Sequence, residues 1–228
     1  MIFYFIPFIF LAILSGLESS QRFYSLIKNK YLYSLITLFF IIFVGLRYEI
    51  GCDWAEYEKM FEKYSPLNIV EIIQRSLFEK HIYGIYKEFG HLLITKISQN
   101  IYILNLIYSI LFSLPLFYFC STLKRSYFSL LISYPYYIVV IGMGPIRQAA
   151  CISFLMLSII LISKKKYYIS LFPTIFSLLI HQSSILFNGL IFSTFFPKIK
   201  KIKVTSKIIL LIILLSIILL YGLPLLIN

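Results

Sequence analysis

The chain has 228 residues, of which 60% are hydrophobic and 13% are charged. Soluble domains have about 45–50% apolar and about 25% charged residues, so the composition excludes an ordinary soluble protein and predicts an all-α, polytopic integral membrane protein. The net charge of +12 would suit nucleic acid, but most basic residues fall in short clusters between apolar runs, which excludes a nucleic-acid-binding surface.

Apolar runs of roughly fifteen to twenty residues recur along the chain, the length that a helix needs to cross a hydrocarbon core roughly 30 Å thick. The first run, MIFYFIPFIFLAILSGL, has neither a basic leader nor a small-residue cleavage site, so we expect a retained span and not a signal peptide. Short loops leave no room for a separate soluble core, which predicts a single domain over residues 1–228. About eight spans are predicted: 1–17, 31–46, 100–120, 127–142, 145–162, 167–181, 183–197 and 207–224.

Clusters of lysine and arginine set the expected orientation of these spans. They are accompanied by a single acid, Glu18, and the positive-inside rule places them in the cytoplasm. Alternating spans then put both termini and the 47–99 loop on the outer side. The clusters are Arg22, Lys28 and Lys30; Lys124 and Arg125; Lys164, Lys165 and Lys166; and Lys198, Lys200, Lys201, Lys203 and Lys207.

The 47–99 loop is too long for a simple connector, and its pattern predicts helices. Apolar residues recur at helical spacing from Trp54 to Tyr64 with charges between them, which is typical of an amphipathic helix at the headgroup level. Asp53 followed by Glu56 fits the start of that helix, with the aspartate as N-cap. A second helical stretch is NIVEIIQRSLFEK, and YKEFGHLLITKIS then re-enters the membrane.

Charges of both signs gather where the second span meets this loop, in GLRYEIGCDWAEY. Arg47 can be read as a side chain that snorkels from the end of a span, and Asp53 as a helix cap alone. The neighbouring residues favour a functional site that includes Arg47 and Asp53. Glu88 is expected at the same membrane surface, and Gly51 permits a close backbone approach.

The stretch IGMGPIRQAACISF places an arginine at the start of a helix. Gly142 and Gly144 break the fourth span, and Pro145 suits the first position of the next helix. Arg147 then falls in the first turn, where a guanidinium and free backbone amides together suit an anion, phosphate above all. The alternative is an arginine that reaches lipid headgroups or pairs with a loop carboxylate.

A third polar group, HQSS at residues 181–184, interrupts an apolar stretch of about thirty residues. Two short spans must fit there, and short or broken spans are where membrane sites tend to form. A lone histidine at such a turn is commonly structural. Here His181 is expected on the same side of the membrane as Arg47, Asp53 and Arg147, which favours a role in a shared site.

The three cysteines, Cys52, Cys120 and Cys151, show no metal-ligand spacing and no even-numbered framework. The sequence also has no glycine-rich phosphate loop and no GxSxG turn. We therefore expect neither a metal nor a cofactor.

Four stretches, GLRYEIGCDWAEY, EFGHLLITKIS, GPIRQAACISF and LIHQSSILF, together resemble the EpsG-like polymerases of bacterial surface polysaccharides, a family related to the Wzy group. Their order and spacing agree over about residues 40–195. Cys52 departs from the small or hydroxyl residue expected there. Eight spans are fewer than usual, so we expect a short or truncated member. The resemblance implies glycosyl transfer at the outer face of the bacterial cytoplasmic membrane, for capsule, exopolysaccharide or O-antigen.

Such a polymerase would join repeat units carried on polyprenyl pyrophosphate, and this chemistry assigns expected roles to particular residues. Arg47 and Arg147 would hold the departing pyrophosphate, because arginine offers forked donors and stays charged. Asp53, ahead of His181, would be the base that takes the proton of the acceptor hydroxyl. Contacts with the sugar or acceptor are expected from Trp54, Tyr57, Glu88 and Gln148.

Three other functions stay open: a transporter or flippase of lipid-linked oligosaccharide, a membrane acyltransferase with His181 as base, and a non-catalytic assembly partner. A carrier usually needs charges within its spans and repeated halves, and the sequence shows neither. An acyltransferase would want a second histidine or an acid beside His181 in the sequence. Lipid-linked oligosaccharide and membrane lipids are the expected partners; participation of a chain-length regulator, a flippase or a second copy stays open.

Overall fold

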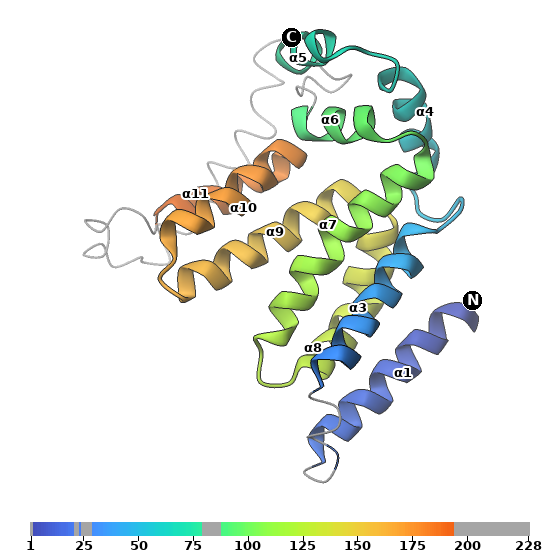
Figure 1. The fold of residues 1–228 in the computed structure, drawn as a ribbon, viewed down its shortest axis with the longest axis vertical. Coiled ribbons are helices and arrows are strands. Elements are labelled where there is room, and N and C mark those ends of the chain that lie inside the picture. Colours follow the sequence, from blue (N-terminus) through green and yellow to red (C-terminus); the bar gives the residue numbers. More distant parts are fainter. Residues whose placement is uncertain (1, 21–22, 24–28, 79–87, 194–228) are drawn as a thin grey trace, which may run out of the picture.

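The computed structural model describes residues 2–20, 23, 29–78 and 88–193, and every regular element among them is helical. Long helices form a bundle, and three shorter helices lie over one end of it (Figure 1). The predicted all-α class is confirmed for these residues. The single domain over the whole chain stays a prediction.

The bundle follows the apolar runs of the sequence closely. Six predicted spans coincide with helices to within two residues, the seventh begins as α11, and the eighth lies outside the described residues. The elements are α1 (Ile2–Ser19), α3 (Lys30–Gly45), α7 (Ile101–Ser121), α8 (Ser126–Ser133) continued by the π-helix η1 (Tyr134–Ile141), α9 (Ile146–Ser163), α10 (Tyr167–Ile180), the 3-10 turn η2 (Gln182–Ser184) and α11 (Ile185–Ser193).

Two helices of the described part, α7 and α9, are long and apolar enough to cross a membrane. The other apolar helices are shorter: Phe3–Ser19, Lys30–Gly45, Ser126–Ile141 and Tyr167–Ile180. The count of eight spans therefore stays a prediction, although the chain is helical where the spans were expected.

Helix α7 lies at the centre of the bundle, between α3 and α9, and α10 packs on the far side of α9. Buried rings and aliphatic side chains such as Phe40, Phe112 and Leu130 fill the space between α3, α7 and α8. Between α9 and α10 the contact combines the rings of Phe154 and Phe176, 4.5 Å apart, with a hydrogen bond of 3.0 Å from Thr174 to Ser158. Small hydroxyl residues of this kind let helices approach closely inside a bilayer.

Glu18, at the end of α1, caps a helix far away in the sequence. Its carboxylate accepts hydrogen bonds from the backbone N–H groups of Ser126, Tyr127 and Phe128, at 2.7, 3.1 and 3.2 Å. These are the first residues of α8, whose N–H groups have no partner inside the helix, and the positive end of the helix dipole favours a carboxylate there. The lone acid among the basic clusters thus fastens α1 to α8.

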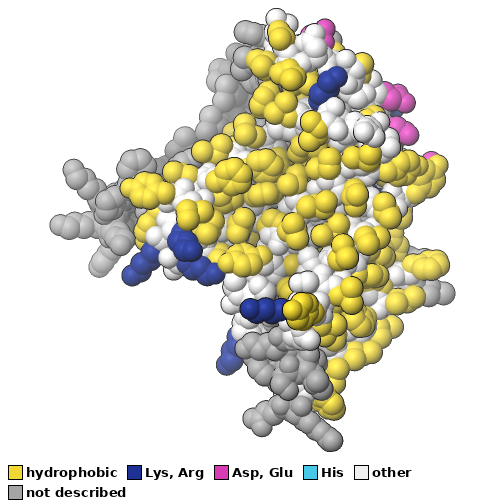
Figure 2. Space-filling model, viewed as in Figure 1, with side chains coloured by type: hydrophobic (Ala, Val, Ile, Leu, Met, Phe, Trp, Pro, Cys, Tyr) yellow, Lys and Arg dark blue, Asp and Glu magenta, His cyan; other side chains and the backbone are white. Residues whose placement is uncertain are grey.

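The visible surface of the bundle is largely apolar, and its two ends differ in charge. Figure 2 shows hydrophobic side chains over the body of the bundle, acidic and basic residues together at the end of the short helices, and basic residues toward the opposite end. The basic turns are Lys124–Arg125 after α7 and Lys164–Lys166 before α10. These turns lie away from the end covered by the short helices (Figure 1), and their cytoplasmic placement stays a prediction.

The short helices come from the 47–99 loop: α4 (Trp54–Tyr64), α5 (Ile69–Phe78) and α6 (Phe89–Ile97). Asn68 and Glu71 cap α5 reciprocally through two side-chain-to-backbone hydrogen bonds of 2.8 Å, which is a capping box. Asp53 occupies the predicted N-cap position of α4, but its side chain makes no capping hydrogen bond. Pro145 is likewise the N-cap of α9 and not its first residue.

Candidate functional site

Four of the predicted site residues meet at the end of the bundle that the short helices cover. They are Tyr57 of α4, Glu88 at the N-cap of α6, Arg147 in the first turn of α9 and His181 at the C-cap of α10. We call this group the Glu88 cluster. Its members come from four elements spread over more than half of the chain, so the tertiary fold assembles it.

Glu88 joins the cluster through both of its carboxylate oxygens. One oxygen accepts a hydrogen bond from Arg147 Nη1 at 2.5 Å, and the other lies 2.7 Å from His181 Nδ1. The side chains of Glu88, Arg147 and His181 are 10%, 18% and 26% exposed, so the histidine is the most accessible of the three. The carboxylate of Glu88 therefore holds the guanidinium of Arg147 and the imidazole of His181 at a position largely shielded from water.

Local sequence explains why these groups stand at helix ends. Gly144 and Pro145 separate η1 from α9, and Arg147 follows as the second residue of α9. His181 has extended backbone angles (φ −154°, ψ 126°) that end α10 before the 3-10 turn. Glu88 is also extended and begins α6. Each side chain can leave its helix axis and reach the others, which a position in the middle of a helix would not permit.

The ring of Tyr57 supports Arg147. The guanidinium carbon lies 5.3 Å from the centre of the ring, and Arg147 Nε donates to the Tyr57 hydroxyl at 3.4 Å. A cation over an aromatic face is attracted by the ring quadrupole. Because Tyr57 is only 2% exposed, its described contacts are with protein, and the expected contact with a sugar stays a prediction.

The electrostatics of the cluster keep Glu88 ionised. Burial would raise the pKa of its carboxyl, but the hydrogen bond with His181 and the positive charge of Arg147 outweigh burial and lower that pKa to about 2. At neutral pH the site therefore contains a carboxylate that can orient the imidazole, as the acid of a catalytic triad does.

This lowered pKa predicts a dependence of stability on pH. The folded value of about 2 lies below the ordinary value of 4.5, so the stabilisation is fully present above about pH 4.5 and is lost as the pH falls toward 2. Thermal unfolding of the purified chain should show a gap between wild type and Glu88→Gln that is wide at pH 7 and narrower at pH 3. A gap of equal width at both values would contradict the ion pairing.

Two residues that the sequence analysis did not single out lie behind the cluster. His91, one turn after Glu88 in α6, is 1% exposed, and its Nδ1 lies 2.8 Å from the hydroxyl of the fully buried Tyr108. The ring of Tyr57 meets His91 edge-on at 6.0 Å. Burial lowers the pKa of His91 to about 3, so this imidazole is neutral and supports the cluster from inside. In the sequence, the Glu-x-x-His spacing from Glu88 to His91 could have indicated that the two residues lie on the same face of a helix.

Arg47 is held separately and lies deep in the protein. It is 4% exposed, and it donates to the carbonyl of Gly142 at 2.9 Å and to the side-chain oxygen of Asn105 at 3.4 Å. Burial lowers its pKa to about 10, which still leaves it charged at neutral pH. Arg47 thus fastens the end of α3 to the turn that precedes α9. Its expected contact with pyrophosphate stays a prediction.

The other predicted residues flank the cluster. Asp53 is half-buried and lies near enough to Arg47 to favour its charged form. Trp54 is buried against the rings of Tyr48 and Tyr102, at 6.0 and 6.4 Å. Gln148 is half-buried beside Arg147. Among the described residues, no hydrogen bond or ion pair joins these three to the Glu88 cluster, and no three potential metal ligands lie together.

Gly51 brings the loop before α4 against the turn before α9. Its φ is +105°, and a Cβ atom there would lie 2.0 Å from the carbonyl oxygen of Met143, so both the conformation and the space require glycine. We expect Gly51→Ala to lower the free energy of unfolding by about 2 kcal/mol, measured in detergent. The matched control is Gly16→Ala in α1, where no atom lies within 4 Å and alanine favours the helix. Equal stability of the two variants would contradict this packing.

Over the described residues the fold defines a class: a helical bundle with two helices long and apolar enough to cross a membrane and a buried charged cluster at one end. A model of the EpsG family matches residues 30–228. The chain belongs to the EpsG family, as the sequence motifs indicated, and is therefore a membrane protein related to polysaccharide biosynthesis. No curated protein and no solved structure matches the chain.

Proposed function

We propose that the chain is the polymerase that joins polyprenyl-pyrophosphate-linked repeat units at the outer face of the bacterial cytoplasmic membrane. The observation that carries this proposal is the Glu88 cluster, in which one carboxylate holds an arginine and a histidine together. Membership of the EpsG family supports the setting, since it relates the chain to polysaccharide biosynthesis.

The proposed reaction needs a base and a group that holds the departing pyrophosphate. The acceptor hydroxyl attacks the anomeric carbon of the donor sugar, and the bond between that carbon and the pyrophosphate oxygen breaks. The hydroxyl proton passes to the base, and the electron pair of the broken bond leaves with the pyrophosphate. A positioned base typically contributes about 10²–10⁴-fold to the rate, and fixed cations stabilise the leaving charge.

We assign the base to His181. Glu88 lies against Nδ1 of its ring, so Nε2 is the nitrogen that can take a proton from an acceptor. In many enzymes the base that deprotonates the nucleophile is itself oriented by another side chain, as Glu88 orients His181 here. Asp53, which the sequence analysis placed first, is the second candidate, since its half-buried carboxylate makes no capping bond and its side-chain hydrogen bond is with Cys52 and not with an imidazole.

We assign pyrophosphate binding to Arg147. Its Nη1 bonds to Glu88 and its Nε to Tyr57, which fixes the guanidinium plane while Nη2 can still donate to an anion. The first turn of α9 adds backbone N–H groups, and helix N-termini favour phosphate. Glu88 offsets part of the positive charge, so the site can release the product as well as hold it.

The cluster also gives an observation for a second function, a membrane acyltransferase. The sequence places no acid beside His181, yet the fold places Glu88 at 2.7 Å from it. A histidine with a carboxylate can deprotonate a hydroxyl for acyl transfer equally well. The two functions differ in product, because acyl transfer alters single sugars without lengthening the glycan.

The test is a gel profile of lipid-linked and surface glycan in cells that lack this gene. Wild type should restore a ladder. Arg147→Lys, which loses the fork, and His181→Asn, which can still bond to Glu88 but cannot act as base, should give single repeats at normal membrane levels. Glu62→Gln, on the exposed face of α4, is the control and should keep the ladder. A ladder in all variants would refute the site, and no ladder with wild type would refute the function.

A further inference from the structure

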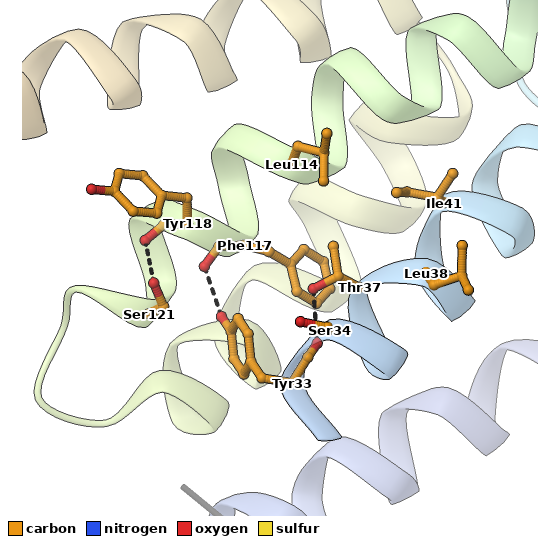
Figure 3. A pocket seen from close by; sticks show the side chains of 9 residues that line it. All are labelled: Tyr33, Ser34, Thr37, Leu38, Ile41, Leu114, Phe117, Tyr118 and Ser121. Atoms are coloured by element: carbon orange, nitrogen blue, oxygen red, sulfur yellow. Dashed lines mark hydrogen bonds between the residues drawn. The ribbon is translucent and has the colours of Figure 1, made fainter. Parts of the chain in front are cut away.

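A groove of about 350 Å³ runs along the outside of the bundle between α3 and α7, and none of its lining residues belongs to the Glu88 cluster. Figure 3 shows the side chains from the two helices on its two walls. They are Tyr33, Ser34, Thr37, Leu38 and Ile41 of α3, and Leu114, Phe117, Tyr118 and Ser121 of α7.

Three of the hydroxyl groups that line this groove bond to the backbone, which makes much of its lining apolar. Tyr33 donates to the carbonyl of Phe117 at 2.8 Å, and Thr37 donates to the carbonyl of Tyr33 at 2.8 Å. Ser121 donates in the same way to the carbonyl of Tyr118 at 2.7 Å, as Figure 3 shows. Rings, methyl groups and aliphatic side chains therefore remain to contact an occupant, which suits a hydrocarbon chain.

The length of the groove matches one leaflet of a bilayer. Its α3 wall extends from Tyr33 to Ile41, a rise of roughly 12 Å at about 1.5 Å per residue. Half of a hydrocarbon core is roughly 15 Å thick. The groove lies along α3 from Tyr33 to Ile41 and along the last part of α7, from Leu114 to Ser121, so it begins near the basic end of the bundle and extends toward its middle.

A fixed cation stands at that basic end. Lys164, in the turn after α9, donates to the hydroxyl of Tyr118 at 2.9 Å, and its ammonium lies 5.2 Å from the centre of the Tyr118 ring. Tyr118 is itself a wall of the groove. Figure 3 shows the Tyr118 ring pointing away from the α3 wall, so Lys164 lies beside the α7 wall of the groove. An apolar slot of one-leaflet length with an ammonium beside one wall has the charge and shape of an anionic lipid with its headgroup at the surface.

We propose that the groove between α3 and α7 binds an acyl chain of an anionic phospholipid, with its phosphate at Lys164. The occupant belongs to the leaflet at the basic end of the bundle. It is distinct from the proposed substrate, because Arg147 and Lys164 lie at opposite ends of the 18-residue helix α9, a separation of roughly 27 Å. One phosphate group cannot contact both.

The experiment measures the lipid retained by the 228-residue chain. The protein is reconstituted in equal parts phosphatidylglycerol and phosphatidylcholine, released gently, and examined by native mass spectrometry. Wild type should retain phosphatidylglycerol in preference. Lys164→Gln should lower this preference about five-fold, the effect of about 1 kcal/mol for one basic residue near an anionic surface. The matched control, Lys166→Gln, changes a neighbouring exposed lysine and should leave the preference unchanged.

A second variant tests the slot itself. Ser34 is exposed on the α3 wall, so Ser34→Phe should fill the groove without disturbing the core and should reduce retention of both lipids. Equal loss for Lys164→Gln and Lys166→Gln, or full retention with Ser34→Phe, would overturn the proposal. Displacement of phosphatidylglycerol by added polyprenyl phosphate would also overturn it and assign the groove to the substrate. Because no polymer is measured, failure of the polymerase function leaves this test unaffected.

Discussion

Glu88→Gln is expected to abolish the glycan ladder, with a loss of activity on the order of 100-fold or more. The amide keeps the size of the side chain, but it removes the charge that orients His181 and pairs with Arg147. Breaking a largely buried ion pair also leaves Arg147 without a counter-charge, which costs about 3 kcal/mol of stability. Glycan gels measure the first effect, and thermal unfolding of the purified chain measures the second.

The control for this prediction is an acid of the same loop that has no partner in the cluster. Glu62→Gln changes an exposed side chain on α4 and should alter neither the ladder nor the unfolding temperature. Glu88→Asp keeps the charge on a shorter side chain and should recover part of the activity. If Glu88→Gln kept a full ladder at normal membrane levels, the cluster would not be the catalytic site.

Arg47→Ala is expected to lower stability about as much as Glu88→Gln, because the guanidinium is buried and fastens two segments. Its hydrogen bonds to Gly142 and Asn105 hold the loop after α3 to the turn before α9. Loss of hydrogen bonds from a charged donor costs roughly 3 kcal/mol for a buried group. The measurement is the unfolding temperature in detergent, with the exposed Lys124→Ala as the matched control.

The outcome for Arg47 separates two roles. An unfolding temperature that falls well below that of Lys124→Ala would show that Arg47 stabilises the fold and positions Arg147 indirectly. An unchanged temperature combined with loss of the ladder would instead support the sequence-based prediction that Arg47 holds pyrophosphate. Arg47→Lys refines this result, since lysine keeps the charge but cannot bond to Gly142 and Asn105 with one planar group.

Helix positions could be predicted from the sequence because apolar runs of membrane length leave few alternatives. Helix ends were also predictable where a glycine, proline or capping residue marks them, as Gly144 and Pro145 do before α9. The side chain of Asp53 was harder to assign, since a favourable cap residue can occupy the N-cap and still make no bond.

The contacts within the site could be anticipated only in part. Shared sidedness of Glu88, Arg147 and His181 follows from the order of the spans, but their pairing depends on how α6, α9 and α10 pack, over a separation of 93 residues for Glu88 and His181. His91 and Tyr108 escaped notice because a histidine and a tyrosine within apolar helices resemble ordinary core residues. Arg47 at the end of a span suggested exposure, whereas the adjoining turn buries it.

The cap that Glu18 provides for α8 also bears on how the protein is made. The carboxylate and its first partner, Ser126, are 108 residues apart, so at about 5–20 residues per second the ribosome needs roughly 5–20 s to add the partner. During this interval α1 is already synthesised, while the helix that it caps does not yet exist. The family match begins at residue 30, after α1. Helix α1 can join α8 only after the middle of the chain has been synthesised. The contact between α1 and α8 can be compared in nascent chains whose synthesis is stalled before and after residue 128. This comparison would show at what chain length the two helices join.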